Sequence, residues 1–142
     1  MAPTARTAAT GGESVGTWGS GNFESDTALD HLSAVVGRLV DEVAEAMAGD
    51  PVGIEPDEYW GEAVPCQLEL LHVLAQAGHS TEGLPKAAVI EGWKETYMAV
   101  WERSIDGLEP KPEYKKKRRE VLNRTFDQLA ADARQAEVDQ DS

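Results

Sequence analysis

The sequence predicts an all-α fold, a small single-domain bundle of about four helices. Apolar residues recur every three or four positions in four separate stretches, and prolines and glycines gather between those stretches. Strand-like alternation is almost absent. At 142 residues, of which 41% are hydrophobic, the chain is long enough to bury one core.

The clearest pattern predicts a helix over residues 26–48. Ser25 or Asp26 can accept a hydrogen bond from a free backbone N–H at its start, and Gly49 ends it. Gly37 inside this helix suggests that a neighbouring helix approaches closely. The apolar stripe consists of Leu29, Leu32, Val36, Leu39, Val43 and Met47.

Three more helices follow. The segment PVGIEPDEYWGEAVP reads as a loop, and a second helix is expected over residues 64–78, with Pro65 in its first turn. A third helix is expected over residues 86–106, where Trp93 and Trp101 share the core face. The fourth begins after Pro112 and runs to about residue 134.

The ends of the chain differ in composition from its middle. Residues 1–14 and 135–142 are small or polar, so we expect a disordered arm and a disordered tail around a helical domain at 15–134. No run approaches the roughly 18–20 apolar residues of a membrane span, and the start has no secretory apolar core. The single cysteine, Cys66, agrees with a cytoplasmic location.

Acidic residues outnumber basic ones by 26 to 13, which gives a net charge of −13. This charge disfavours a broad nucleic-acid interface, because phosphates would be repelled. It indicates either solubility alone or an acidic face that meets a basic protein. The basic block at residues 115–119 is expected to pair with acidic helices of the same molecule, and contact with an anionic surface is the alternative.

The stretch GTWGSGNFESDTALDHL, residues 16–32, crowds glycines and aromatic rings before the first helix. Glycines permit sharp turns, so we expect this irregular segment to pack on the bundle as a clasp, laying Trp18 and Phe23 against the helices. Anion binding is the alternative, but the lysine and strand of a phosphate loop are missing. The residues of the motif are Trp18, Gly19, Gly21, Phe23, Asp26 and Asp30.

The same motif resembles the opening signature of a bacterial family, domain-of-unknown-function family 4259, whose pattern is G-x-W-G-x-G-x-F-[DE]-[NS]-D-x-A-x-D. The match runs from Gly16 to Asp30. The later stretch ETYMAVWERSIDG resembles the family's tryptophan-containing tract, with Trp101 in the tryptophan's place. The resemblance implies a small helical bacterial domain and no established activity.

Two sets of residues could form a metal-binding or catalytic site. Glu69 and His72 have the Glu-x-x-His spacing of di-iron bundles, but such a site needs two copies and the chain has one. We therefore expect His72 at the bundle surface or partly buried with a hydrogen-bond partner. Cys66, near the predicted helix start, is expected to be a half-buried thiol, because His72 lies about 9 Å further along the helix.

Trp60 lies in the predicted loop, where a large aromatic side chain can anchor a binding partner, and covering the core is the other interpretation. Together these observations predict a non-catalytic protein-interaction module of the immunity or antitoxin kind, with a basic protein as its partner and no cofactor. The alternative is a small enzyme with a metal or thiol site near His72 and Cys66.

Overall fold

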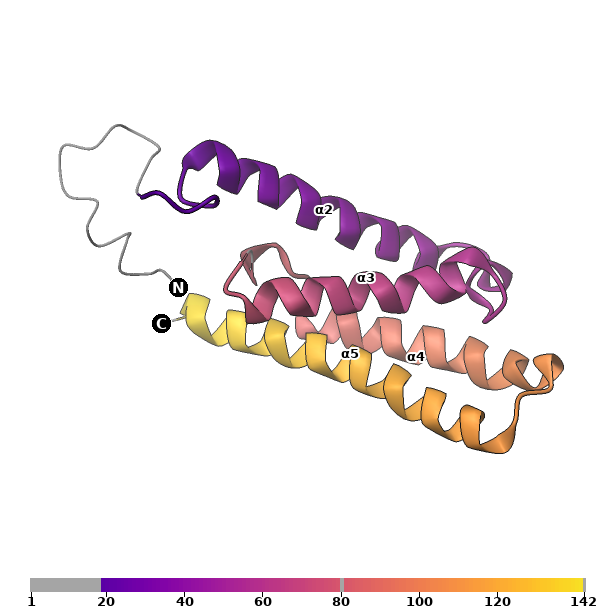
Figure 1. Ribbon diagram of the computed structural model, residues 1–142. Helices are drawn as coiled ribbons and strands as arrows, with labels where there is room; N and C mark the ends of the chain where they lie inside the picture. The colour runs from indigo at the N-terminus through magenta and orange to yellow at the C-terminus, as the bar shows by residue number, and fades with distance from the viewer. Residues whose placement is uncertain (1–18, 80, 142) are drawn as a thin grey trace.

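A computed structural model describes residues 19–79 and 81–141 and confirms the all-α fold (Figure 1). These residues form no strand and four α-helices: α2 (Asp26–Ala48), α3 (Tyr59–Gln76), α4 (Ala87–Ser104) and α5 (Pro112–Asp141). Short 3-10 turns lie in the connections: η1 (Pro51–Ile54), η2 (Thr81–Gly83) and η3 (Ile105–Leu108). Consecutive helices run in opposite directions.

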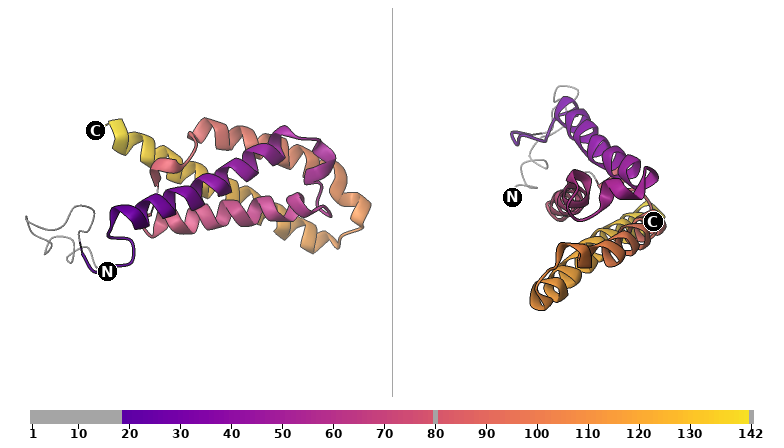
Figure 2. Two further views of the ribbon diagram at one scale, coloured as in Figure 1. Left: turned by 90° about the horizontal axis from the view of Figure 1, so that it is seen from above. Right: turned by 90° about the vertical axis from the view of Figure 1, so that its right-hand side faces the viewer.

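The helices pack as a bundle in which α3 lies between α2 and α5 (Figure 2). α4 packs along α5, and the contact between α2 and α4 is the least extensive of these. α3 packs on α5 more extensively than on α2, so all four helices form one bundle; the first part of the chain supplies α2, η1 and α3, and the second supplies α4, η3 and α5. None of the described helices is long and apolar enough to cross a membrane.

The core is filled from all four helices, and the predicted core tryptophans Trp93 and Trp101 are both buried. Tyr97 of α4 packs on Phe126 of α5, with ring centroids 5.5 Å apart. The other large core side chains are Leu32, Val36, Val43, Val64, Leu68, Leu71, Ile90, Ile105, Leu122 and Leu129.

α2 has the predicted bounds. The hydroxyl of Ser25 accepts a hydrogen bond from the N–H of Ala28 at 3.1 Å, so Ser25 rather than Asp26 caps the helix. Gly49 ends the helix as predicted. The prediction for Gly37 is wrong, because a Cβ added there meets nothing within 4 Å.

α3 begins at Tyr59, earlier than the predicted residue 64, and this corrects two predictions. Trp60 lies in the first turn of the helix rather than in a loop, and Pro65 lies inside the helix rather than in its first turn. A helical proline has no N–H for the carbonyl four residues before it, here that of Gly61. The buried phenol of Tyr97 donates a hydrogen bond to that carbonyl at 2.5 Å, so the gap in the backbone ladder is filled.

Gly61 also lets the start of α3 approach η1. An added Cβ would overlap the carbonyl oxygen of Glu55 and would lie 2.7 Å from its carbonyl carbon. Only glycine fits this contact between two backbones, which places Trp60 beside the end of α2.

The ends of α3 and α5 follow from local geometry. Gly78 has a positive φ of 85° and donates to the carbonyl of Ala75, while the N–H of His79 bonds to the carbonyl of Leu74 at 2.8 Å. This is a Schellman motif, and it ends α3 close to where the sequence predicts. α5 continues through Asp141, so residues 135–141 are helical and the predicted disordered tail is corrected.

Candidate protein-binding site

The two halves of the bundle differ sharply in charge. Residues 26–76, which form α2, η1 and α3, contain 11 acidic residues and a single basic one, Arg38. Residues 87–141, which form α4, η3 and α5, contain 12 acidic and 10 basic residues. We call residues 26–76 the acidic half, since they carry −10 of the net charge of −13.

Within the second half, four of the ten basic residues form an ion pair with a carboxylate of the same half. The predicted internal pairing of the basic block is confirmed for two of its five residues: Lys115 forms an ion pair with Asp106 at 2.7 Å, and Arg119 donates to Glu102 at 2.5 and 2.9 Å. The hydrogen bond from Arg119 lowers the pKa of Glu102. Two further pairs, Lys94 with Asp127 and Arg134 with Glu91, also join α4 to α5. Between described residues, no Lys or Arg pairs with a carboxylate of the acidic half.

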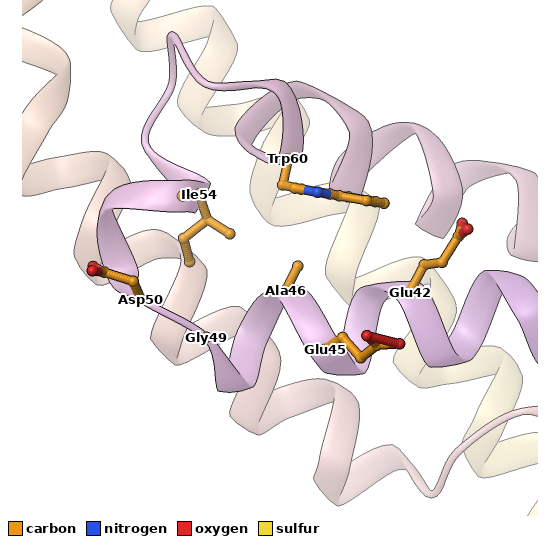
Figure 3. Close-up of a pocket in the computed structure, with 8 residues that line it drawn as sticks. Glu42, Glu45, Ala46, Gly49, Asp50, Ile54 and Trp60 are labelled. Atoms are coloured by element: carbon orange, nitrogen blue, oxygen red, sulfur yellow. The ribbon is translucent and has the colours of Figure 1, made fainter.

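A cavity of about 280 Å³ opens in the acidic half beside Trp60 (Figure 3). In Figure 3 the indole of Trp60 lies over Ala46 of α2, Glu42 points from α2 toward α3, Glu45 lies against α2, and Asp50 points away from Trp60. The lining residues are Glu42, Glu45, Ala46, Gly49, Asp50, Gly53, Ile54 and Trp60.

Two contacts orient the side chains of this cavity. The buried amide of Gln67 donates to the Glu42 carboxylate at 2.9 Å and to the backbone carbonyl of Leu39 at 3.3 Å, so α3 holds the carboxylate in place. The indole of Trp60 is partly buried against the core and meets the ring of Tyr59 edge-on, with centroids 5.1 Å apart. Trp60 therefore covers the core and lines an open cavity at once.

This arrangement fits a long cationic side chain. An aromatic face attracts a cation electrostatically, and a neighbouring carboxylate adds a charge-assisted hydrogen bond. The apolar surface of Ile54 and Ala46 would cover the aliphatic stem of a lysine or arginine. The cavity thus matches the chemistry of a basic protein surface.

The residues of the N-terminal motif do not converge on this cavity. Phe23 is 37% exposed and lies against the ring of His79, with centroids 4.6 Å apart, at the end of the bundle where α3 stops. At Gly21, an added Cβ would lie 2.5 Å from a carboxylate oxygen at the end of the Glu24 side chain, which would have to shift to make room. Trp18 lies outside the described residues, and the clasp stays a prediction. Gly19 is half-buried, and Asp26 and Asp30 are exposed on α2.

His72 is partly buried and has a hydrogen-bond partner, as the sequence predicts, although the partner itself was not predicted. Its Nδ1 lies 2.6 Å from a carboxylate oxygen of Asp132, and Gln76 donates to the other oxygen at 2.9 Å, so both tie α3 to α5. Cys66 is exposed rather than half-buried, and the early start of α3 places it away from the helix N-terminus. In the described ranges, no three His, Cys, Asp or Glu side chains are grouped to hold a metal ion.

Sequence reasoning singled out Trp60 but missed Glu42, Glu45 and Gln67. Their spacing along α2 and α3 carries no motif, and they meet only because η1 folds the chain back beside the end of α2. No family model, curated protein or solved structure matches this chain. The resemblance to family 4259 therefore stays a prediction from the motif at residues 16–30.

Proposed function

We propose that the protein is a non-catalytic interaction module of the immunity or antitoxin kind, which binds a basic protein through its acidic half. The observation that carries the proposal is the uneven charge, with 11 acidic residues against Arg38 in residues 26–76. Such a surface accelerates the encounter with a basic partner and repels acidic ones. The proposal includes a bacterial origin, which the family resemblance supports, and a cytoplasmic location, which the lone cysteine supports.

The cavity beside Trp60 supplies the anchor in this proposal. A partly desolvated cation over an indole is worth about 0.5–2 kcal/mol, and a charge-assisted hydrogen bond about 1.5–3 kcal/mol. One lysine or arginine of the partner would enter between Trp60, Glu42 and Glu45. Exposed acidic residues around the cavity would contribute mainly to the association rate.

Hexa-arginine, titrated calorimetrically at low and high salt, tests the proposal. The double variant E42Q/E45Q removes both cavity charges and keeps the hydrogen-bonding capacity of residue 42. Because neutral hydrogen bonds replace charge-assisted ones, the affinity of this variant for hexa-arginine should fall by about three- to tenfold. The matched control E95Q/E120Q removes two exposed charges from α4 and α5 and should change the affinity by less than about twofold.

Binding to the unmodified protein should weaken as salt rises, because the peptide is attracted by charge. Two results would overturn the proposal: no binding at low salt, or equal losses in both double variants. Equal losses would mean that net charge alone attracts the peptide.

A further inference from the structure

α3 carries a second apolar stripe that faces away from the core. Its buried stripe contains Val64, Leu68 and Leu71. The outward stripe, which we call the outer row, consists of Tyr59, Ala63, Cys66, Leu70 and Val73. Tyr59 is 75% exposed, Leu70 52% and Val73 55%.

The outer row has the spacing of a coiled-coil seam. Its members are alternately four and three residues apart, which keeps them on one side of the helix for about 21 Å of its length. Single exposed apolar residues are ordinary on protein surfaces, but a continuous row along one helix marks an interaction site. The alternation of four and three is the pattern that receives the side chains of another helix.

The edges of the outer row are acidic. Glu62 and Glu69 are exposed and seven residues apart, so they border the row on one side. On the other side Gln67 holds the carboxylate of Glu42. At its beginning, Tyr59 contacts Trp60, so the row leads to the cavity described above.

We infer that the outer row docks a basic amphipathic helix of the partner protein, an inference that rests on the proposed function. The partner's apolar side chains pack on Cys66, Leu70 and Val73, and its lysines or arginines meet Glu62 and Glu69. Charges beside a coiled-coil seam determine which helices pair, and here they select a basic one.

Charge also decides against a second copy of this chain as the occupant. A dimer with two-fold symmetry brings the same surface of both copies together. Here that surface lies in the acidic half, so two sets of carboxylates would face one another across the row. A basic helix at the same place is attracted by these carboxylates instead of being repelled by them.

The test uses a synthetic peptide of about three heptads, with leucine at a and d and lysine at the flanking positions. Lysine flanks keep the free peptide from pairing with itself. A control peptide carries glutamate at the same flanks. Binding is followed by fluorescence anisotropy of the labelled peptide and by the rate at which iodoacetamide alkylates Cys66, the exposed thiol in the middle of the row.

The variant L70S/V73S removes two exposed side chains of the outer row and should weaken binding of the lysine peptide about tenfold or more. The control V89S/L108S removes an exposed valine and an exposed leucine from outside α3, at 45% and 48% exposure, and should leave the affinity unchanged. The lysine peptide should also slow alkylation of Cys66, whereas the glutamate peptide should not.

The outcomes separate this inference from the proposed function. One outcome is that L70S/V73S binds the lysine peptide with normal affinity while E42Q/E45Q binds it more weakly. In that case the outer row is not the docking site and the proposed function stands. If hexa-arginine binds and the lysine peptide does not, the outer row is again not the docking site and the proposed function again stands. Equal binding of both peptides, or concentration-dependent dimers that protect Cys66 without peptide, overturns the inference. If no basic peptide binds, both proposals fail.

Discussion

The phenol of Tyr97 in α4 donates a hydrogen bond to the carbonyl oxygen of Gly61 in α3, 2.5 Å away. Pro65 makes this bond necessary, because it removes the N–H that would otherwise reach the same carbonyl. The first turn of α3 holds Trp60 beside α2. The hydrogen bond from Tyr97 anchors this turn to α4, on the other side of α3 from α2. The position of Trp60 in the cavity therefore depends on the stability of this turn.

Replacing Tyr97 with phenylalanine should lower the free energy of unfolding by about 1–3 kcal/mol. The variant leaves the carbonyl of Gly61 without its partner, and an unsatisfied buried acceptor costs about that much. Urea denaturation measures the change. Tyr114, which is 56% exposed, supplies the matched control, and Y114F should change stability by less than about 0.5 kcal/mol. Equal effects in the two variants would contradict the role given to this bond.

Alkaline pH should destabilise the protein through Tyr97. Burial raises the pKa of Tyr97 from 10.0 to about 12, so the folded state favours the neutral phenol. The resulting stability is fully present below pH 10.0 and is lost as pH rises through about 12. Its size is on the order of 3 kcal/mol. The unfolding free energy of Y97F should fall less over this range, and parallel curves for both proteins would refute the assignment.

Gly61→Ala should destabilise the protein by about 2 kcal/mol or more, because the new methyl group overlaps the backbone of Glu55. Gly37 and Gly92 are the controls, since an added Cβ meets nothing within 4 Å at either position. Alanine at each control position should stabilise its helix by about 0.5–1 kcal/mol. Thermal unfolding gives all three values, and a neutral Gly61→Ala would disprove the close approach of α3 to η1.

Asp132→Ala should cost about 1–3 kcal/mol, because it leaves the partly buried His72 and the amide of Gln76 without their shared acceptor. Asp127→Ala removes a carboxylate that is 62% exposed and pairs with Lys94, so it should cost less than about 1 kcal/mol. Urea denaturation of both variants checks the difference. A larger loss at Asp127 would mean that the surface pair, rather than the His72 contact, joins α5 to its neighbours.

The fold was predictable where one apolar stripe settles the orientation of a helix. α2 has such a stripe, and its bounds match the prediction. The start of α3 was not predictable, because a proline suits a first helical turn and only the distant Tyr97 lets Pro65 lie deeper. The outer row was not predicted, since an exposed apolar stripe has the same helical spacing as the buried one on the other side of α3.

The cavity was predictable only in part. Trp60 is conspicuous as an aromatic residue among prolines and glycines, but its neighbours Glu42 and Glu45 lie in another helix. Their meeting depends on the backbone contact at Gly61, which sets the path of η1. A contact between two backbones has no side-chain pattern that sequence analysis could detect.

The central claim is that the acidic half binds basic ligands at Trp60. Its most direct test is a titration of hexa-arginine into ¹⁵N-labelled protein, followed by NMR, with the Trp60 indole signal assigned from the variant W60F. We predict saturable shifts of that signal and of amides in α2, η1 and the start of α3, with α4 and α5 unaffected. Shifts confined to α4 and α5, or spread evenly over the chain, would contradict the account.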